Sequence, residues 1–127
     1  MKFQSVDEIW VWRESVDLCV ELFGISENVQ LTNYRDQQLF NHLCRTAVSI
    51  PSNIAEGYER GSLAEFRKFL YIARGSCSEL KTQLLITGRV DKRLDEKANI
   101  LIDRCKCISA GLYKLIQYLS KKSDIHG

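Results

Sequence analysis

The hydrophobic and polar positions of this chain repeat at helical spacing along most of its length. Apolar residues recur every three or four positions, as one face of an α-helix requires, and no useful stretch alternates with the period of two that is typical of a strand. The pattern predicts helices over about residues 6–25, 34–60, 63–88 and 95–121. We therefore predict an all-α fold, an antiparallel up-down four-helix bundle in which residues 1–127 form a single domain.

Local signals indicate where the helices begin and end. Ser5 and Glu8 stand three residues apart and form a capping box for the first predicted helix. Gly61 is followed by a second capping box, Ser62 to Glu65, so a helix stop and a helix start lie next to each other. A turn this short makes the second and third helices antiparallel neighbours.

Each predicted helix has an apolar stripe that we expect to be buried. The first helix is also apolar beside its stripe, at Trp10 and Val11, and a helix apolar on more than one face needs a second partner surface. We expect self-association to supply that surface, with a broad intramolecular interface as the alternative. The expected stripes are Ile9, Trp12, Val16, Cys19 or Val20, and Phe23; Leu39, Leu43, Ala47, Ile50 and Ile54; Phe66, Phe69, Leu70, Ala73, Cys77, Leu80 and Leu84; and Leu101, Cys105, Ile108, Leu112, Leu115 and Leu119.

The single proline of the chain, Pro51, stands in the middle of the second predicted helix. A proline at this position removes one backbone donor and crowds the carbonyl of Ala47, at a cost of about 3 kcal/mol. Ser49, Ser52 and Asn53 are placed to hydrogen-bond the freed backbone groups. We therefore expect a local kink at Pro51 rather than a break in the helix.

Two polar rows occupy matching positions on the second and third predicted helices. We expect them to meet across the Gly61 turn, because residues 53 and 76 lie at similar distances from it and because Ala73 and Gly75 let the backbones approach. We interpret the rows as an interhelical hydrogen-bond network that fixes register. The alternatives are a polar functional site, the lining of a channel in an oligomeric ring, or a catalytic pair of the two glutamates. The rows contain Ser49, Asn53, Glu56 and Arg60, and Ser76, Glu79 and Gln83.

Two motifs carry a family resemblance. One reads A-V-S-I-P-S-N-I-A-E-G, from Ala47 to Gly57, and the other reads E-F-R-K-F-L-Y-I-A-R-G-S-C-S-E-L, from Glu65 to Leu80, with V-W-R at Val11 to Arg13. Over about residues 5–120 the chain resembles the bacterial four-helix bundle proteins named after intervening sequences in large-subunit ribosomal RNA genes. The resemblance implies a short four-helix bundle that assembles as a ring, with a homopentamer favoured. It also suggests association with nucleic acid.

The same resemblance bears on partners. A related accessory protein of diversity-generating retroelements also forms a pentameric bundle and works beside a reverse transcriptase, so such an enzyme is one expected protein partner. The family often has two consecutive basic residues before the A-V-S-I run, where this chain has Cys44 and Arg45. If that pair touches phosphate in relatives, half of it is missing here.

The composition is typical of one globular domain. Hydrophobic residues make up 45% of the chain and charged residues 27%, and no apolar run approaches the ~20 residues that cross a bilayer. The beginning of the sequence shows no signal peptide, so we expect a cytoplasmic protein that makes no membrane contact.

The cysteines fall at or beside apolar positions, with Cys19, Cys44, Cys77 and Cys105 divided one to each predicted helix. We expect reduced thiols packed in the core, with redox sensitivity and metal binding as alternatives. Cys107 follows Cys105 at a spacing that does not match a C-x-x-C site.

The sequence has no recognisable catalytic motif. A di-iron bundle needs a Glu-x-x-His pair on each of two helices, whereas His42 and His126 are preceded three residues earlier by Leu39 and Ser123. Neither a G-x-x-x-x-G-K-[ST] phosphate loop nor a G-x-S-x-G elbow is present. We therefore expect a protein that is not an enzyme and that has no cofactor or metal.

Charge is unevenly distributed, although the formal net charge is only +2. Residues 1–36 contain seven acidic and three basic side chains, whereas residues 60–93 contain eight basic and three acidic ones. Arg67, Arg74 and Lys81 stand seven residues apart and so lie along one side of the third helix. We interpret the second region as a nucleic-acid contact surface; the alternative is an ordinary solvated helix face. Its basic residues are Arg60, Arg67, Lys68, Arg74, Lys81, Arg89, Lys92 and Arg93.

These observations predict a non-enzymatic, oligomeric bundle protein that binds nucleic acid, with RNA favoured over DNA, through the basic surface. A ring would multiply that surface and let several weak phosphate contacts act together. The competing hypothesis is an oligomeric scaffold or adaptor that binds a protein partner and has no nucleic-acid role.

Overall fold

The computed structural model describes residues 3–126, and side chains as far as residue 122. Within that range the chain forms four α-helices and two short 3-10 helices and no strand. The elements are η1 (Val6–Glu8), α1 (Trp10–Asn28), α2 (Tyr34–Glu59), α3 (Leu63–Val90), η2 (Lys92–Leu94) and α4 (Asp95–His126). The prediction of an all-α chain with four helices is confirmed, and the architecture is consistent with a four-helix bundle. Residues 1, 2 and 127 of the predicted domain lie outside the described residues.

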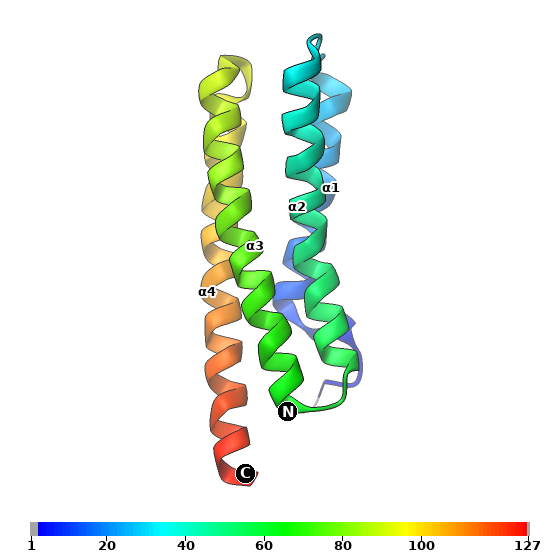
Figure 1. Ribbon diagram of the computed structural model, residues 1–127, viewed down its shortest axis with the longest axis vertical. Coiled ribbons are helices and arrows are strands. Elements are labelled where there is room, and N and C mark those ends of the chain that lie inside the picture. Colours follow the sequence, from blue (N-terminus) through cyan, green and yellow to red (C-terminus); the bar gives the residue numbers. More distant parts are fainter. Residues whose placement is uncertain (1–2, 127) are drawn as a thin grey trace.

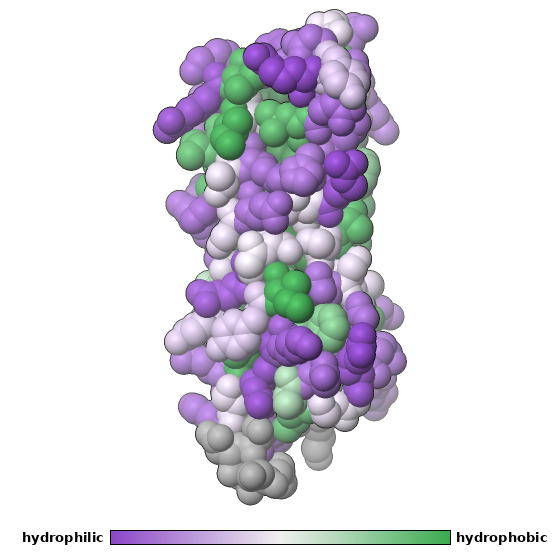
Figure 2. All heavy atoms as spheres, viewed as in Figure 1, coloured by the Kyte–Doolittle hydropathy of each residue, from purple (hydrophilic) through white to green (hydrophobic). Residues whose placement is uncertain are grey.

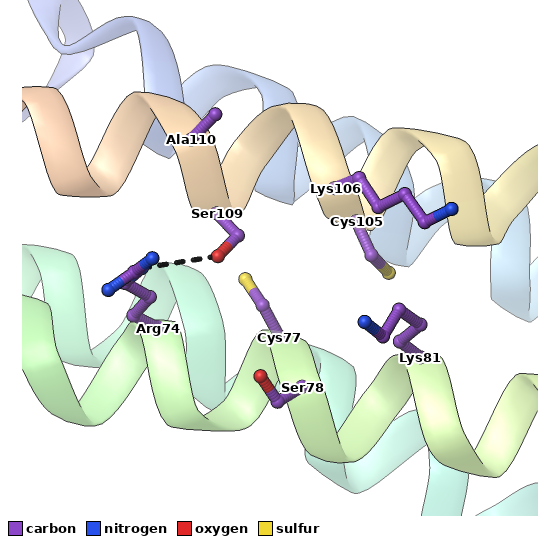
Figure 3. A pocket seen from close by; sticks show the side chains of 8 residues that line it. All are labelled: Arg74, Cys77, Ser78, Lys81, Cys105, Lys106, Ser109 and Ala110. Atoms are coloured by element: carbon purple, nitrogen blue, oxygen red, sulfur yellow. Dashed lines mark hydrogen bonds between the residues drawn. The ribbon is translucent and has the colours of Figure 1, made fainter.

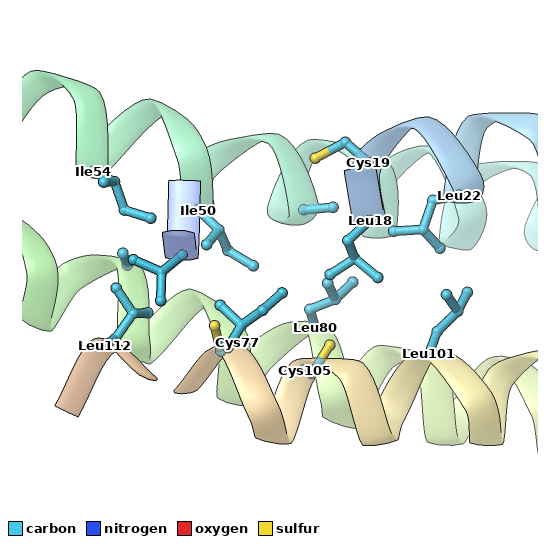
Figure 4. Packing of buried hydrophobic residues seen from close by; sticks show 14 of the residues in the cluster. Leu18, Cys19, Leu22, Ile50, Ile54, Cys77, Leu80, Leu101, Cys105 and Leu112 are labelled. Atoms are coloured by element: carbon cyan, nitrogen blue, oxygen red, sulfur yellow. The ribbon is translucent and has the colours of Figure 1, made fainter. Parts of the chain in front are cut away.

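The four helices lie side by side along one long axis (Figure 1). Each helix packs against the next one in the chain, most extensively α3 against α4 and α2 against α3, whereas α1 and α4 share a smaller contact. Their apolar side chains meet in one core, where Leu18, Ile50, Leu80 and Leu112 are fully buried (Figure 4). No helix in the described part of the chain is both long enough and apolar enough to cross a membrane.

The beginning of the first helix differs from the prediction. Glu8 accepts a hydrogen bond from the backbone N of Ser5 at 3.3 Å, but this capping box closes the 3-10 turn η1 rather than α1. Ile9 follows in an extended conformation with its side chain almost fully buried, and α1 starts at Trp10. The extended residue turns an apolar side chain into the core, so the α-helix begins four residues later than about residue 6, where it was expected.

The buried face of α1 also differs from the expected stripe. Ile9 and Cys19 of that stripe are buried as expected. Trp12 and Val16 are only half-buried, however, and Val20 and Phe23 are 66% and 51% exposed, so the centre of the stripe at Trp12 is wrong. The helix is apolar around much of its circumference, and α2 and α4 cover a face rotated by about one residue. Apart from Ile9, the buried residues are Val11, Ser15, Leu18, Cys19, Leu22 and Ile25.

In the other helices the expected stripes are buried except for Leu39, Phe69 and Leu115, which are half-buried. The four cysteines predicted to lie in the core are buried there, while Cys107 is exposed. All five are free thiols.

Helix α2 continues through Pro51 without interruption. Nearby, Ser49 donates its hydroxyl to the carbonyl of Thr46 at 2.5 Å, and Asn53 donates from Nδ2 to the carbonyl of Ser49 at 2.7 Å. Two of the three predicted side chains therefore hydrogen-bond the backbone around the proline. Their acceptors are not the carbonyl of Ala47, which Pro51 crowds.

Glycines control the turn between α2 and α3. Gly61 has φ 85°, a left-handed conformation that disfavours other residues, and Ser62 then caps α3 by accepting from the backbone N of Glu65 at 3.1 Å. The close approach of the two helices occurs at Gly57, where an added Cβ would lie 2.6 Å from Cβ of Phe69. Gly75 is exposed with no neighbour within 4 Å of an added Cβ, so the expectation that it brings the backbones together is wrong.

Candidate nucleic-acid interface

The structure divides the predicted basic residues into groups with different surroundings. Arg60 lies at the end of α2, where its guanidinium forms an ion pair with Glu56 at 2.7 Å. The same guanidinium lies 5.0 Å from the centre of the Phe69 ring. Arg60 therefore has an intramolecular partner for its charge.

Arg93 lies at the far end of α3, in η2, and is also paired. Its Nη2 lies 2.6 Å from a carboxylate oxygen of Asp91 and also donates to the carbonyl of Gln30 at 3.2 Å. The hydrogen bond from Arg93 lowers the pKa of Asp91, so the carboxylate stays ionised near neutrality. Lys68, Arg89 and Lys92 are exposed.

The central residues of the set lie on the side of α3 that faces α4. Arg67 donates from Nη1 to the carbonyl of Leu119 at 3.4 Å, and Arg74 donates from Nε to Ser109 Oγ at 3.3 Å. Lys81 continues this side of α3 one heptad further along. Helix α4 therefore supplies the neighbours of this basic row.

Arg74 and Lys81 share a pocket between α3 and α4, and Figure 3 shows the side chains that line it. Its volume is about 220 Å³, and no carboxylate is among its lining residues. Lys106 of α4 lines the same pocket and adds a third cation that the sequence prediction did not include. The lining consists of Arg74, Cys77, Ser78, Lys81, Cys105, Lys106, Ser109 and Ala110.

The two thiols of the pocket are neutral near physiological pH. Burial and, to a smaller extent, the adjacent Cys105 thiol together raise the pKa of Cys77 to about 12, against the opposing effect of Arg74. Burial likewise raises the pKa of Cys105 to about 12, although Arg104 and Lys81 act in the other direction. Because neither sulfur ionises, the thiols contribute no negative charge that would neutralise the surrounding cations.

The polar rows on α2 and α3 meet, but not in the expected register. Ser49 donates to Ser76 at 2.8 Å between the hydroxyl oxygens, one turn away from the predicted juxtaposition of residues 53 and 76. Asn53 hydrogen-bonds its own helix, and Glu56 pairs with Arg60. The two predicted glutamates therefore have different partners and do not form a pair.

Glu79 has neighbours that the sequence prediction missed. His42 Nε2 lies 3.6 Å from Oε1 of Glu79, which also accepts from Thr46 at 3.5 Å and from Gln83 at 3.4 Å. Oε1 of Gln83 is buried without a hydrogen-bond partner. Within residues 3–122, no group of three or more His, Cys, Asp or Glu side chains is placed to hold a metal ion.

Comparison with protein-family models matches residues 7–114 to the 23S rRNA-intervening sequence protein family. This match covers most of the chain, including both motifs and the α3 and α4 residues of the basic pocket. The chain belongs to that family. No curated protein matches the sequence. As a 23S rRNA-intervening sequence protein, the chain combines the family motifs with a basic pocket that lies within the matched region.

Proposed function

We propose that this intervening-sequence family protein is a non-enzymatic, oligomeric bundle that binds nucleic acid, RNA in preference to DNA, through the α3–α4 face. The observation that carries the proposal is the pocket in which Arg74, Lys81 and Lys106 surround a cavity without a carboxylate. Phosphate groups are attracted to such clusters, and each contact contributes a salt-dependent increment to affinity. The family name, which refers to ribosomal RNA, points to the same class of ligand.

The finer architecture belongs to the same proposal. We propose an up-and-down bundle with a local bend at Pro51, assembled as a homopentamer. Figure 1 draws consecutive helices joined by short connections at alternating ends of the molecule, which supports this topology. A ring would repeat the basic pocket at regular intervals, so that contacts that are weak singly act together on one long ligand.

Binding of structured RNA and of duplex DNA to the purified protein, at two salt concentrations, tests the proposal. The test variant replaces Arg67, Arg74 and Lys81 by glutamate. We expect the affinity of the unmodified protein to fall steeply with salt, with a slope of about −0.9 per phosphate contact on duplex DNA, and the variant to lose binding.

A charge-matched control replaces Lys97, Lys114 and Lys121 by glutamate, since all three are exposed and lie outside the pocket. Circular dichroism and mass in solution are measured for every variant. Equal losses of nucleic-acid affinity in both triple variants would mean that net charge, rather than the α3–α4 face, determines binding. If the folded oligomer bound no nucleic acid even at low salt, the proposal would be overturned.

The alternative function is that of an oligomeric scaffold that binds a protein, and an apolar region on α1 and α2 favours it. Phe23, at 51% exposure, and Val48, at 40%, line an open groove together with Arg45. The face in Figure 2, where α2 and α3 lie in front, has its larger apolar patches near the upper end and a smaller one near the middle, among polar and neutral side chains. A partner such as a reverse transcriptase, which the family resemblance implies, would then bind with little sensitivity to salt.

The double variant Phe23→Glu and Val48→Glu separates the roles of this groove. If the groove joins subunits, the mass in solution falls; if it binds a different protein, the mass stays constant while partner binding is lost.

A further inference from the structure

The α3–α4 pocket concentrates positive charge in a way that calls for a counter-ion. Arg74, Lys81 and Lys106 line one cavity, and no salt bridge in the described part of the chain includes any of them. Like charges on neighbouring side chains repel one another, and the repulsion is relieved when an anion sits between them. Other basic groups of this protein, such as Arg60 and Arg93, already have a carboxylate. The pocket therefore brings together three cations without an ion-pair partner among the described residues, and an anion bound between them would relieve their mutual repulsion.

Arg74 is positioned before any ligand arrives. Its guanidinium lies 4.7 Å from the centre of the Tyr113 ring, and its Nε is used by Ser109. The terminal nitrogens make no hydrogen bond within the described residues, so they can form the paired contacts to two oxygens that guanidinium groups make with phosphate. Figure 3 shows the guanidinium at one end of the pocket and the ammonium group of Lys81 directed between the helices.

The size and the remaining lining also suit an oxyanion. A volume of about 220 Å³ is many times the ~10–15 Å³ that one water molecule needs, so a tetrahedral anion fits. Ser78 and Ser109 place hydroxyl groups in the lining, and hydroxyls can donate to anionic oxygens. The thiols of Cys77 and Cys105 are protonated near neutrality and do not repel an anion.

We propose that this pocket binds a single phosphate group, with Arg74 contacting its oxygens and Lys81 and Lys106 supplying charge from α3 and α4. The phosphate can be free inorganic phosphate or one backbone phosphate of a nucleic acid; only the second source rests on the function proposed above. In Figure 3 the side chain of Lys106 extends along α4. Because a lysine side chain is flexible, we expect its ammonium group to turn toward the bound anion.

Titration with inorganic phosphate in a chloride buffer of constant ionic strength tests the pocket directly. Heat of binding gives the affinity, and the backbone amide chemical shifts of Ser78 and Ser109 report whether the anion occupies this site. The variants are Lys81→Gln and Lys106→Gln, each of which removes one lining charge. Lys114→Gln is the matched control, because it removes one exposed lysine of α4 that does not line the pocket.

We expect phosphate to shift both serine amides and each lining variant to weaken binding about fivefold, the value for one screened charge near 4 Å, while the control changes it less than about twofold. Saturable binding that the lining variants leave unaltered, or no shift at Ser78 and Ser109, overturns the phosphate site.

The same variants are then titrated with structured RNA. Parallel weakening by Lys81→Gln and Lys106→Gln supports backbone phosphate as the source. Phosphate binding in a protein that binds no nucleic acid supports the pocket with free phosphate and overturns the proposed function. RNA binding that the lining variants do not weaken, without binding of inorganic phosphate, overturns the pocket and its part in the proposed function, and leaves nucleic-acid binding to be assigned to another surface.

Discussion

The guanidinium of Arg74 on α3 lies 4.7 Å from the centre of the Tyr113 ring on α4. The same side chain donates from Nε to Ser109 at 3.3 Å, so two residues of one helix hold one cation of the other. Both α4 residues lie on the side that faces α3, four positions apart. This relationship fixes one end of the basic pocket and also contributes to the largest helix pairing in the molecule.

Replacing Tyr113 by leucine should lower both stability and phosphate affinity. The ring face is lost, and a cation–π contact at an exposed site contributes about 0.5–1 kcal/mol. Phosphate affinity should also fall, because Arg74 loses the contact that holds its guanidinium in place. Urea unfolding measures the loss of stability, and phosphate titration measures the loss of affinity. Tyr113→Phe is the control: it keeps the ring and removes only the hydroxyl, which accepts from Gln117 at 3.1 Å. If phenylalanine and leucine reduce phosphate affinity equally, the ring does not position the guanidinium.

The sequence was sufficient for the number and type of the helices but not for the face that α1 buries. Helices α2 to α4 each have one dominant apolar stripe, so their buried residues follow from spacing. Helix α1 has apolar residues on several sides, including Val11, Val20 and Phe23. Several stripes then satisfy the same period, and the choice depends on where α2 and α4 lie. Spacing within one helix contains no information about that position.

The same limit applies to the candidate site. Arg74 and Lys81 follow from their heptad spacing on α3, but Lys106 joins them only because α4 packs beside α3 in one register. In the polar rows, counting from the Gly61 turn gave a pairing one turn away from the observed Ser49 and Ser76 contact. The close contact of Gly57 with Phe66 and Phe69 brings α2 and α3 together beside the turn. The sequence alone does not show which residues of α3 lie against Gly57.

The hydroxyls of Ser49 and Ser76 should show a measurable coupling in a double-mutant cycle. They lie 2.8 Å apart in a half-buried position between α2 and α3. A hydrogen bond of this kind contributes a net ~0.5–1.5 kcal/mol, so the Ser49→Ala and Ser76→Ala effects on unfolding free energy should not add. The double variant should be less destabilised than the sum by about that amount. Additive effects would show that the two hydroxyls stabilise the fold independently.

Alanine at two glycines should have effects of opposite sign. At Gly57 the new Cβ would lie 2.6 Å from Cβ of Phe69 and 3.3 Å from the backbone oxygen of Phe66, so the α2–α3 contact must open. We expect Gly57→Ala to destabilise by about 1–3 kcal/mol, as overpacking does. Gly75→Ala is the matched control on an exposed helical position with no close neighbour, and should stabilise by about 0.5–1 kcal/mol. Urea unfolding measures both, and a neutral Gly57→Ala would contradict the close packing of the turn.

Stability should fall as the pH rises above 9, because the core contains buried thiols. Burial raises the pKa of Cys77 and Cys105 to about 12 from the model-compound value of 9.0. Between these values the unfolded chain releases thiol protons that the folded chain retains, so the unfolded state binds fewer protons and the free energy of unfolding decreases with pH. Each thiol's contribution to the free energy of unfolding is fully present below pH 9. It is lost as the pH rises toward 12, at about 1 kcal/mol per pH unit.

Cys77→Ala isolates this effect from the other groups that titrate in the same range. The variant loses packing at every pH, but its unfolding free energy should decline less steeply than that of the unmodified protein between pH 9 and pH 11. The difference between the two curves therefore narrows as the pH rises, and urea unfolding at pH 8, 9, 10 and 11 measures it. Parallel curves would mean that the Cys77 thiol ionises equally easily in both states, and the pocket would then contain a thiolate in alkaline solution. A thiolate at Cys77 would neutralise part of the positive charge of Arg74 and Lys81. The same series therefore also tests whether the Cys77 thiol, which lines the pocket, stays uncharged.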